Sequence, residues 1–214
     1  MKKLLMITLL IFCFSVLVFA QTENTTPKTL EDLKQQTKSF KDRRQYEVRY
    51  DKFEDLTLVR FSGNNLVTSG EQFGALLGKA MAGSSDPRGV PMLLLGAGFI
   101  FTGDTLKESP KDYLIYFDYS GESWAFLKSS KLIFLVDGER IQFGEGEVDR
   151  TIKKRGVAEI IGFKALRADL LKIGSGKSVE LKIGSLARKL KSEQAQMFSN
   201  IVKLGDMSER PQVK

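Results

Sequence analysis

The chain contains no histidine and a single cysteine, and these absences exclude most of the chemistry that small enzymes use. Histidine is the usual general base near neutral pH. Without it there is no Ser-His-Asp or Cys-His catalytic group and almost no zinc or copper site. The single cysteine, Cys13, lies in an N-terminal apolar run, so the chain after this run has no thiol for a disulfide, a nucleophile or a metal ligand. We therefore expect no cofactor, no metal site and no thiol chemistry.

The first 20 residues are typical of a secretory signal peptide. Two lysines precede a stretch of sixteen residues without charge, Leu4 to Phe19, and Ala20 is the kind of small residue that a signal peptidase recognises. At about 1.5 Å per residue this stretch reaches about 24 Å, short of the roughly 30 Å hydrocarbon core of a membrane. We predict cleavage before Gln21 and export to a periplasmic or extracellular space, with an uncleaved membrane tether as the alternative.

Basic residues outnumber acidic ones by 33 to 26, which gives a formal net charge of +7. Removal of Lys2 and Lys3 with the signal peptide would leave +5. A surplus of this size is compatible with an ordinary solvated surface, and also with attraction to an anionic envelope surface. Nucleic acid is a poor partner for an exported protein. The partners we consider are therefore an apolar ligand, an anionic envelope surface or another protein.

After the signal peptide, the chain divides into a polar tether, one domain and a polar tail. Residues 21–45 are polar, and Thr29 with Asp32 in the capping-box position predicts a short, marginal helix. Residues 46–205 suit one domain with one core, and residues 206–214 form a tail that frays. Repeated glycines in residues 62–91 predict a long mobile connection with a short helix at 72–81.

Alternation of apolar and polar residues predicts a strand-rich domain, with Asp137-Gly138 as its strongest hairpin signal. Because short turns force antiparallel neighbours, the central block should be a meander. Helices are expected at Ala165–Ile173 and from a cap at Ser192 to Leu204. The predicted fold class is α+β: a curved, mainly antiparallel sheet or two-layer sandwich covered by a C-terminal helix-strand-helix unit. The predicted strands are Tyr46–Asp51, Leu56–Phe61, Leu93–Thr102, Tyr113–Tyr119, Ser123–Leu127, Leu132–Val136, Arg140–Phe143, Glu147–Lys153, Val157–Phe163 and Ser178–Ile183.

The stretch GSGKS, Gly174 to Ser178, resembles the end of a phosphate-binding loop, but its surroundings argue against a nucleotide site. The first glycine of such a loop would fall on Leu171. The order is also reversed, because a helix is predicted before the loop and a strand after it. We interpret Gly174 instead as the left-handed residue that ends the helix. Gly96 and Gly98, in an apolar strand, likewise indicate close backbone packing rather than dinucleotide binding.

Ten of the 18 aromatic residues that follow the signal peptide lie between Phe99 and Phe143. Core packing of a sheet explains most of them. However, both faces of LIFLV and of YLIYF are apolar, and such strands must be covered on both sides, either by further layers or around an internal pocket. Our leading hypothesis is an exported, non-enzymatic module that binds an apolar or amphiphilic ligand or an envelope partner. The residues expected to line the pocket are Phe99, Phe101, Tyr116, Tyr119, Trp124, Phe126 and Phe134.

The alternative hypothesis is a hydrolase that acts on envelope glycans with two carboxylates and no histidine, as glycosidases do. Asp118 and Glu122 flank one predicted turn, beside Tyr119 and Trp124, which are able to stack on a sugar ring. The simpler interpretation is turn chemistry, because acidic residues collect at turns, where they are solvated and accept local backbone hydrogen bonds.

Overall fold

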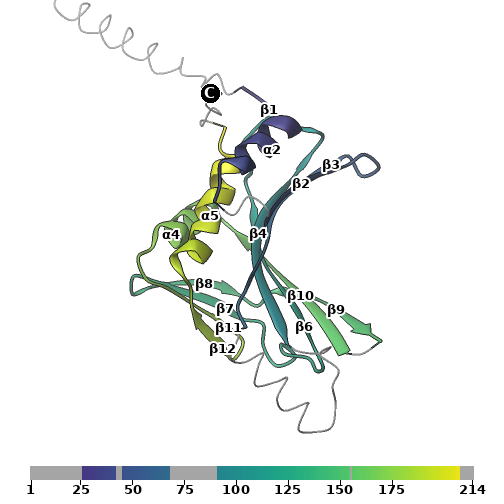
Figure 1. Cartoon of the computed structure of the whole chain (residues 1–214). Coiled ribbons are helices and arrows are strands. Elements are labelled where there is room, and N and C mark those ends of the chain that lie inside the picture. Colours follow the sequence, from purple (N-terminus) through teal and green to yellow (C-terminus); the bar gives the residue numbers. More distant parts are fainter. Residues whose placement is uncertain (1–25, 42–44, 68–90, 155, 208–214) are drawn as a thin grey trace, which may run out of the picture.

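The structure, a computed structural model, describes residues 26–41, 45–67, 91–154 and 156–207. It is an α+β fold of mainly antiparallel strands with a helix at the C-terminal end (Figure 1), which confirms the predicted fold class. The predicted signal peptide at 1–20, the predicted helix at 72–81 and residues 208–214 lie outside the described residues. Within the ranges that are described, no helix combines the length and the apolar character needed to span a membrane.

The larger of the two main sheets has six strands in the order β2-β3-β4-β6-β10-β9, and every neighbouring pair is antiparallel. Its register shifts once, at a bulge in β3 between Phe61 and Asn64. The strands are β2 (Tyr46–Asp51), β3 (Leu56–Asn65), β4 (Met92–Thr102), β6 (Tyr113–Gly121), β9 (Glu147–Lys153) and β10 (Gly156–Ala165).

A second sheet has four strands in the order β12-β11-β7-β8, and a short pair joins β1 to β5. Asp137 and Gly138 connect β7 to β8 with φ values of 50° and 89°, which are the positive values of a tight hairpin turn. The predicted hairpin is therefore confirmed. The strands are β1 (Lys28–Thr29), β5 (Thr105–Leu106), β7 (Leu132–Val136), β8 (Glu139–Gly144), β11 (Val179–Ile183) and β12 (Leu186–Lys189).

The strand predicted at Ser123–Leu127 is wrong, because this stretch is irregular and carries the chain from the six-stranded to the four-stranded sheet. The backbone N–H groups of Ala125 and Phe126 donate to the carboxylate of Glu159, at 2.7 and 3.1 Å, so they are not available to a neighbouring strand. As a result β6 lies beside β10 rather than β7, and the central strands do not form one continuous meander.

The helix α2 (Leu30–Lys38) begins where the capping box predicts it. Thr29 and Asp32 make the reciprocal bonds of this box, and the Thr29 amide donates to the Asp32 carboxylate at 2.8 Å. Leu33 on this helix is fully buried in the core. The helix is therefore packed against the domain, although the sequence pattern assigns it to a polar tether.

The other helices, α4 (Arg167–Ser175) and α5 (Ser192–Gly205), pack against each other near the C-terminal end of the chain. The prediction that Ser192 caps α5 is wrong: the cap residue is Lys191, and Ser192 is the first residue of the helix. The backbone amide of Lys191 donates to the side-chain oxygen of Gln194 at 2.8 Å. Met197, Ile201 and Leu204 are buried as the helical pattern predicts.

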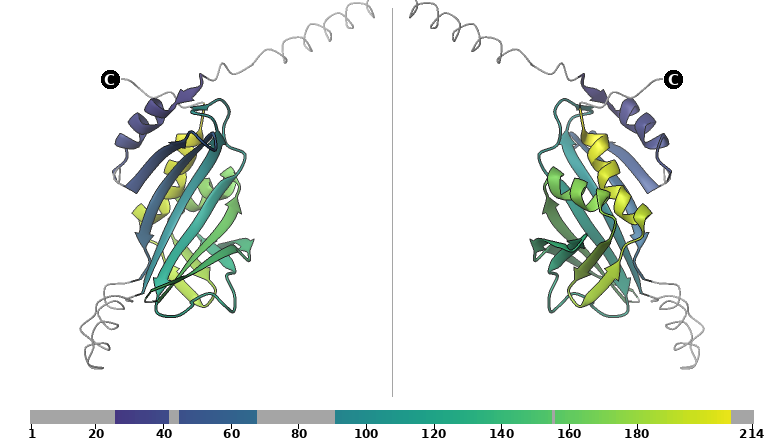
Figure 2. Two further views of the ribbon diagram at one scale, coloured as in Figure 1. Left: turned by 90° about the vertical axis from the view of Figure 1, so that its right-hand side faces the viewer. Right: turned by 90° about the vertical axis from the view of Figure 1, so that its left-hand side faces the viewer.

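The core lies on one side of the six-stranded sheet, its inner face. Helix α5 runs over β3 and β4, and the four-stranded sheet covers the rest of this side (Figure 1). Phe134 on β7 and Phe198 on α5 meet edge to face, with 5.7 Å between ring centroids, which joins the two layers. The two views in Figure 2 show the consequence: helices and the four-stranded sheet lie before one face of the large sheet, and its strands lie uncovered on the other.

The interpretation of Gly174 as a left-handed helix end is wrong. Helix α4 continues through Gly174 to Ser175, and the residue that follows the helix, Gly176, has a φ of −64°. A Cβ atom on Gly174 would lie 2.5 Å from the backbone nitrogen of Ser199, which is far inside van der Waals contact. Glycine is needed here because α4 and α5 approach each other closely at this point.

We predict that Gly174→Ala destabilises the protein by roughly 1–3 kcal/mol, because the added methyl group forces the two helices apart. At an ordinary helix position the same change would stabilise by about 1 kcal/mol, so the sign of the effect is diagnostic. Urea unfolding monitored by circular dichroism measures it. A variant that is more stable than the wild type would contradict the close approach of α4 and α5.

Candidate functional site

The outer face of the six-stranded sheet contains an open groove of about 610 Å³, here called the outer groove. Side chains and glycines from β3, β4, β6, β9 and β10 form it, so regular strands rather than loops define its shape. The lining residues are Leu58, Arg60, Gly98, Leu114, Tyr116, Asp118, Glu147, Val148, Asp149, Ile160 and Gly162.

The pairing register places the groove residues in rows across the strands. One row contains Tyr116, Gly162 and Glu147, since Gly162 pairs with Tyr116 on β6 and with Glu147 on β9. The next row contains Asp118, Ile160 and Asp149 by the same pairing. Neighbouring residues of a row point to the same face of the sheet, so each row presents its side chains together.

The groove is empty above Gly162. A Cβ atom built on this residue would meet nothing within 4 Å, so its missing side chain leaves open space. The surroundings are apolar, with Leu58 and Leu114 half-buried and Ile160 49% exposed. This part of the groove therefore presents hydrocarbon surface that no described element covers.

Tyr116 forms a fixed wall of the groove. Its ring lies over Gly96, where a Cβ atom would come within 2.1 Å of the ring, and its hydroxyl donates to the Phe61 carbonyl at 2.7 Å. Burial raises the pKa of Tyr116 to about 12, while the nearby Arg60 opposes this shift. The hydroxyl therefore stays protonated at physiological pH and keeps the ring in place.

The charged residues of the groove are mostly acidic. Arg60, the cation in the lining, is held by Glu47, with 2.7 Å between Nε and Oε2. Asp118, Glu147 and Asp149 have no ion-pair partner among the residues that the structure describes. No group of three His, Cys, Asp or Glu side chains in those same ranges is placed to hold a metal ion.

A second hollow, the inter-sheet pocket, has a volume of about 270 Å³ and opens between β4 and β6 on one side and β12 on the other. It is smaller than the outer groove, and apolar side chains predominate in it. Its lining residues are Val67, Pro91, Leu93, Tyr119, Ala125, Phe126, Ser185, Leu186 and Arg188.

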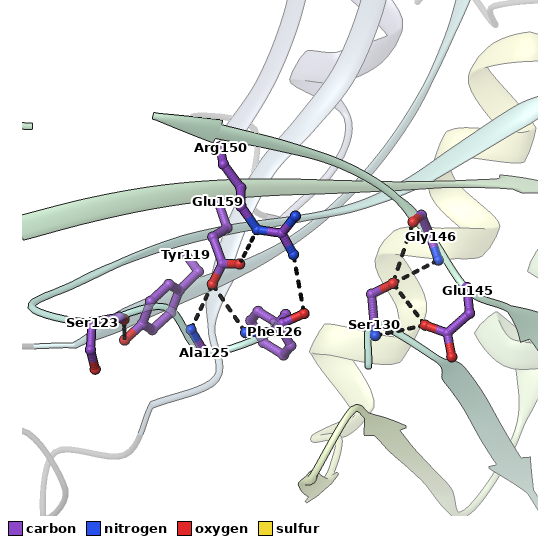
Figure 3. Close-up of polar contacts among 9 residues, drawn as sticks. All are labelled: Tyr119, Ser123, Ala125, Phe126, Ser130, Glu145, Gly146, Arg150 and Glu159. Atoms are coloured by element: carbon purple, nitrogen blue, oxygen red, sulfur yellow. Dashed lines mark hydrogen bonds and ion pairs between the residues drawn. The ribbon is translucent and has the colours of Figure 1, made fainter. Parts of the chain in front are cut away.

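An ion pair between the buried Glu159 and Arg150, whose side chain is 35% exposed, holds the wall of the inter-sheet pocket (Figure 3). Glu159 is fully buried, and one of its carboxylate oxygens accepts hydrogen bonds from the backbone amides of Ala125 and Phe126. Its other oxygen is 3.1 Å from Arg150 Nε, and a second Arg150 nitrogen donates to the Phe126 carbonyl at 3.2 Å. All these bonds fix the irregular stretch after β6 onto β9 and β10, which assigns Glu159 a structural role.

Figure 3 also shows a second carboxylate with a similar task. Glu145 accepts the Ser130 amide at 2.7 Å and the Ser130 hydroxyl at 3.0 Å, and the Gly146 amide donates to the same hydroxyl. The bond from the Ser130 amide is the main reason that the pKa of Glu145 is lowered. Glu145 is solvent-exposed, whereas Glu159 is not.

The structure does not gather the seven aromatic residues expected to line a pocket. Phe99 and Phe134 are fully buried in the core. Tyr116 lies in the outer groove, while Tyr119 and Phe126 line the inter-sheet pocket. The remaining two lie elsewhere: Phe101 lines a hollow at the loop after β4, and Trp124 is half-buried in the irregular stretch.

The two candidate catalytic carboxylates also differ in position. Asp118 borders the outer groove, whereas Glu122 is an exposed residue just beyond the end of β6 and is not part of the lining. Glu147, Asp149 and Gly162 also line the groove, and none of them was predicted from the sequence. All three residues lie at outward positions of predicted strands, but only the pairing of β10 with β6 and β9 shows that these positions are neighbours.

The GSGKS stretch uses its backbone amides within the fold. The amides of Lys177 and Ser178 donate to the Asp137 carboxylate at 3.1 and 2.7 Å, and β11 follows them. Both bonds lower the pKa of Asp137, and the bond from Ser178 has the larger effect. The order of helix, loop and strand is the one predicted, and amides that would face a phosphate in a nucleotide-binding loop here bind a side chain of the neighbouring hairpin.

We predict that Asp137→Asn is less stable than the wild type at pH 7, and that the difference shrinks as the pH falls. The pKa of Asp137 is lower in the folded state than its ordinary value of 3.8. The ionised carboxylate therefore stabilises the fold fully at pH values above 3.8, and this stabilisation is lost as the pH falls through the folded-state pKa. Asparagine tolerates the φ of 50°, so only the charge changes. Urea unfolding at pH 7 and pH 2.5 measures the difference, with Glu180→Gln as control; a difference independent of pH would contradict this account.

We predict that Glu159→Gln destabilises the protein by about 2–4 kcal/mol, because a neutral amide loses the ion pair to Arg150 and weakens two hydrogen bonds to a fully buried side chain. Glu145→Gln serves as the matched control, since Glu145 also accepts a backbone amide but is exposed. Guanidinium unfolding should show a clearly smaller loss for the control. Equal losses would show that burial of Glu159 is not what makes its bonds matter.

Comparison with known proteins adds no relative to these observations. No family model matches the chain, no curated protein matches it, and no solved structure resembles it. The function of the outer groove has to be inferred from its own shape and chemistry.

Proposed function

We propose that this protein is an exported, non-enzymatic binding module whose outer groove takes a small apolar or amphiphilic molecule. The observation that carries the proposal is the open space above Gly162, surrounded by Leu58, Leu114 and Ile160. Apolar side chains left in contact with water are unfavourable, and a ligand that covers them is bound in proportion to the apolar area removed from water.

The size of the outer groove supports this proposal. Its volume of about 610 Å³ falls within the roughly 300–1,000 Å³ of ordinary small-molecule sites. The inter-sheet pocket, at about 270 Å³, falls below that range. The space between the layers is occupied by side chains such as Phe99, Phe117 and Phe134, all fully buried, so the outer face offers more room for a ligand than the space between the layers.

The sheet surface favours a small molecule over a peptide strand. The strands β4, β6 and β10 at the centre of the groove are paired on both sides, so their backbone groups are already bonded to each other. A peptide laid across these strands would bury its own N–H and C=O groups without partners, which is costly. A hydrocarbon chain or ring has no such groups.

The carboxylate-hydrolase alternative is less well supported. Asp118 lies three positions before the last residue of β6, a distance of about 10 Å along a strand, and Glu122 follows that last residue. The strand therefore separates Glu122 from Asp118. The two carboxyl groups of a glycosidase lie about 5–9.5 Å apart on either side of one bond. Only Asp118 borders the groove, and this arrangement favours a binding role.

Export is part of the proposal, and it rests on the sequence of residues 1–20. The mass of the intact protein purified from its host tests it. A mature chain that begins at Gln21 would support export, whereas a full-length chain beginning at Met1 and recovered from the cytoplasm would contradict it.

We predict that Gly162→Leu weakens the binding of N-phenyl-1-naphthylamine, a neutral apolar dye, at least tenfold, because the new side chain fills the space above Gly162. The φ of Gly162 is not in the left-handed region, and a Cβ atom meets no neighbour, so the fold should be retained. A fluorescence titration of the dye measures binding, and a thermal unfolding curve confirms the fold.

Gln142→Leu is the matched control for this experiment. It adds a leucine at an exposed, uncharged position of β8, in the four-stranded sheet and outside the outer groove. The control should bind the dye as the wild type does. If the dye does not bind the wild type, or binds Gly162→Leu equally well, the outer groove is not the binding site.

A further inference from the structure

We infer that the ligand of the outer groove is a small cationic amphiphile, with its apolar body over Gly162 and Ile160 and its ammonium or guanidinium group among Asp118, Glu147 and Asp149. This inference rests on the function proposed for the groove, and it adds the charge of the ligand. It depends on where the three carboxylates lie, on their lack of partners and on the chemistry that their spacing allows.

The carboxylates flank the apolar centre of the groove from two sides. Asp118 on β6 and Asp149 on β9 both pair with Ile160 on β10, and Glu147 on β9 pairs with Gly162. Since neighbouring strands are about 4.8 Å apart, the Cα atoms of Asp118 and Asp149 are separated by about 10 Å, with Ile160 between them. A molecule seated over Gly162 and Ile160 therefore has a carboxylate on either side.

No cation of the described chain neutralises these carboxylates. Arg60 is paired with Glu47, and Arg150 on β9 is paired with Glu159 on the opposite face of the sheet. Lys164 lies on the outer face beside Leu114, but it is not a lining residue and forms no ion pair with any of the three acids. The groove is thus locally negative on a chain whose formal net charge is +7.

This local reversal of charge favours an organic cation. A cleft lined by one sign of charge with apolar walls concentrates ligands of the opposite sign. A bare metal ion fits poorly, because no three acidic side chains in the described ranges come close enough together to coordinate one. An ammonium or guanidinium group on an apolar body needs no such convergence, since it contacts one or two carboxylates while its body covers hydrocarbon.

Three dodecyl probes that differ only in their head groups test the inference: dodecyltrimethylammonium, dodecyl maltoside and dodecyl sulfate, each below its micelle concentration. Isothermal titration calorimetry should show the cationic probe binding at least about tenfold more tightly than the neutral one, if each exposed carboxylate contributes a few-fold. The preference should shrink in 0.3 M salt, which screens exposed charges. The net charge of the protein favours the anionic probe, so a cationic preference has to arise locally.

The variant Asp118→Asn/Glu147→Gln/Asp149→Asn should bind the cationic and neutral probes equally. Its control is Glu31→Gln/Glu54→Gln/Glu180→Gln, which changes the net charge by the same amount at exposed positions outside the groove and should retain the preference. The three single groove variants should each lose part of it. They give an answer even if the triple variant fails to fold, which a thermal unfolding curve would reveal.

The outcomes separate the inference from the proposed function. Equal binding of cationic and neutral probes to the wild type, abolished by Gly162→Leu, would overturn the inference and leave the groove as an apolar site. A cationic preference that survives in the triple groove variant would also overturn the inference. Failure of every probe to bind, or binding unaffected by Gly162→Leu, would overturn both.

Discussion

Burial of the inner face of the six-stranded sheet, beneath α5 and the four-stranded sheet, is the interaction on which the rest of the structure depends. Residues such as Val59, Phe99 and Ile115 are fully buried there, and strand geometry turns their immediate neighbours to the opposite face. A register shift of one residue would exchange the two sets, so the register that buries the core also determines what lies outside. The outer groove follows from core packing for this reason.

Two buried charged groups join segments that are far apart in the sequence. Glu159 with Arg150 ties the stretch between the two sheets to β9 and β10. At the other end, the ammonium group of Lys28, only 3% exposed, donates to the carbonyls of Lys203, Leu204 and Asp206 at the end of α5. Carbonyl groups at a helix C-terminus lack partners within the helix and attract cations. Lys28 thus joins the first described strand to the last helix.

The pattern of the sequence was sufficient for most strands and for the fold class, because period-two alternation is a local signal that one buried face produces. It was insufficient where a distant group decides. The backbone of Ala125 and Phe126 is drawn out of strand geometry by Glu159, 33 and more residues later, and Gly174 is required by Ser199 on another helix. The aromatic residues were chosen by type, without knowledge of which face each one occupies. The groove carboxylates are brought to the two sides of one groove only when β6, β10 and β9 are paired.

The two-sided apolar character of YLIYF nevertheless has a physical meaning. Its inward residues form core, and its outward ones, Leu114 and Tyr116, line the outer groove. Three glycines lie on the same outer face. Gly96 leaves room for Tyr116 and Gly98 for the backbone of β3, whereas a side chain on Gly162 would touch nothing. Glycine weakens a strand interior, so its presence at 162 has a cost that packing does not explain. If the outer groove binds a ligand as proposed, glycine at this position keeps the centre of the groove open, because any larger residue would occupy it.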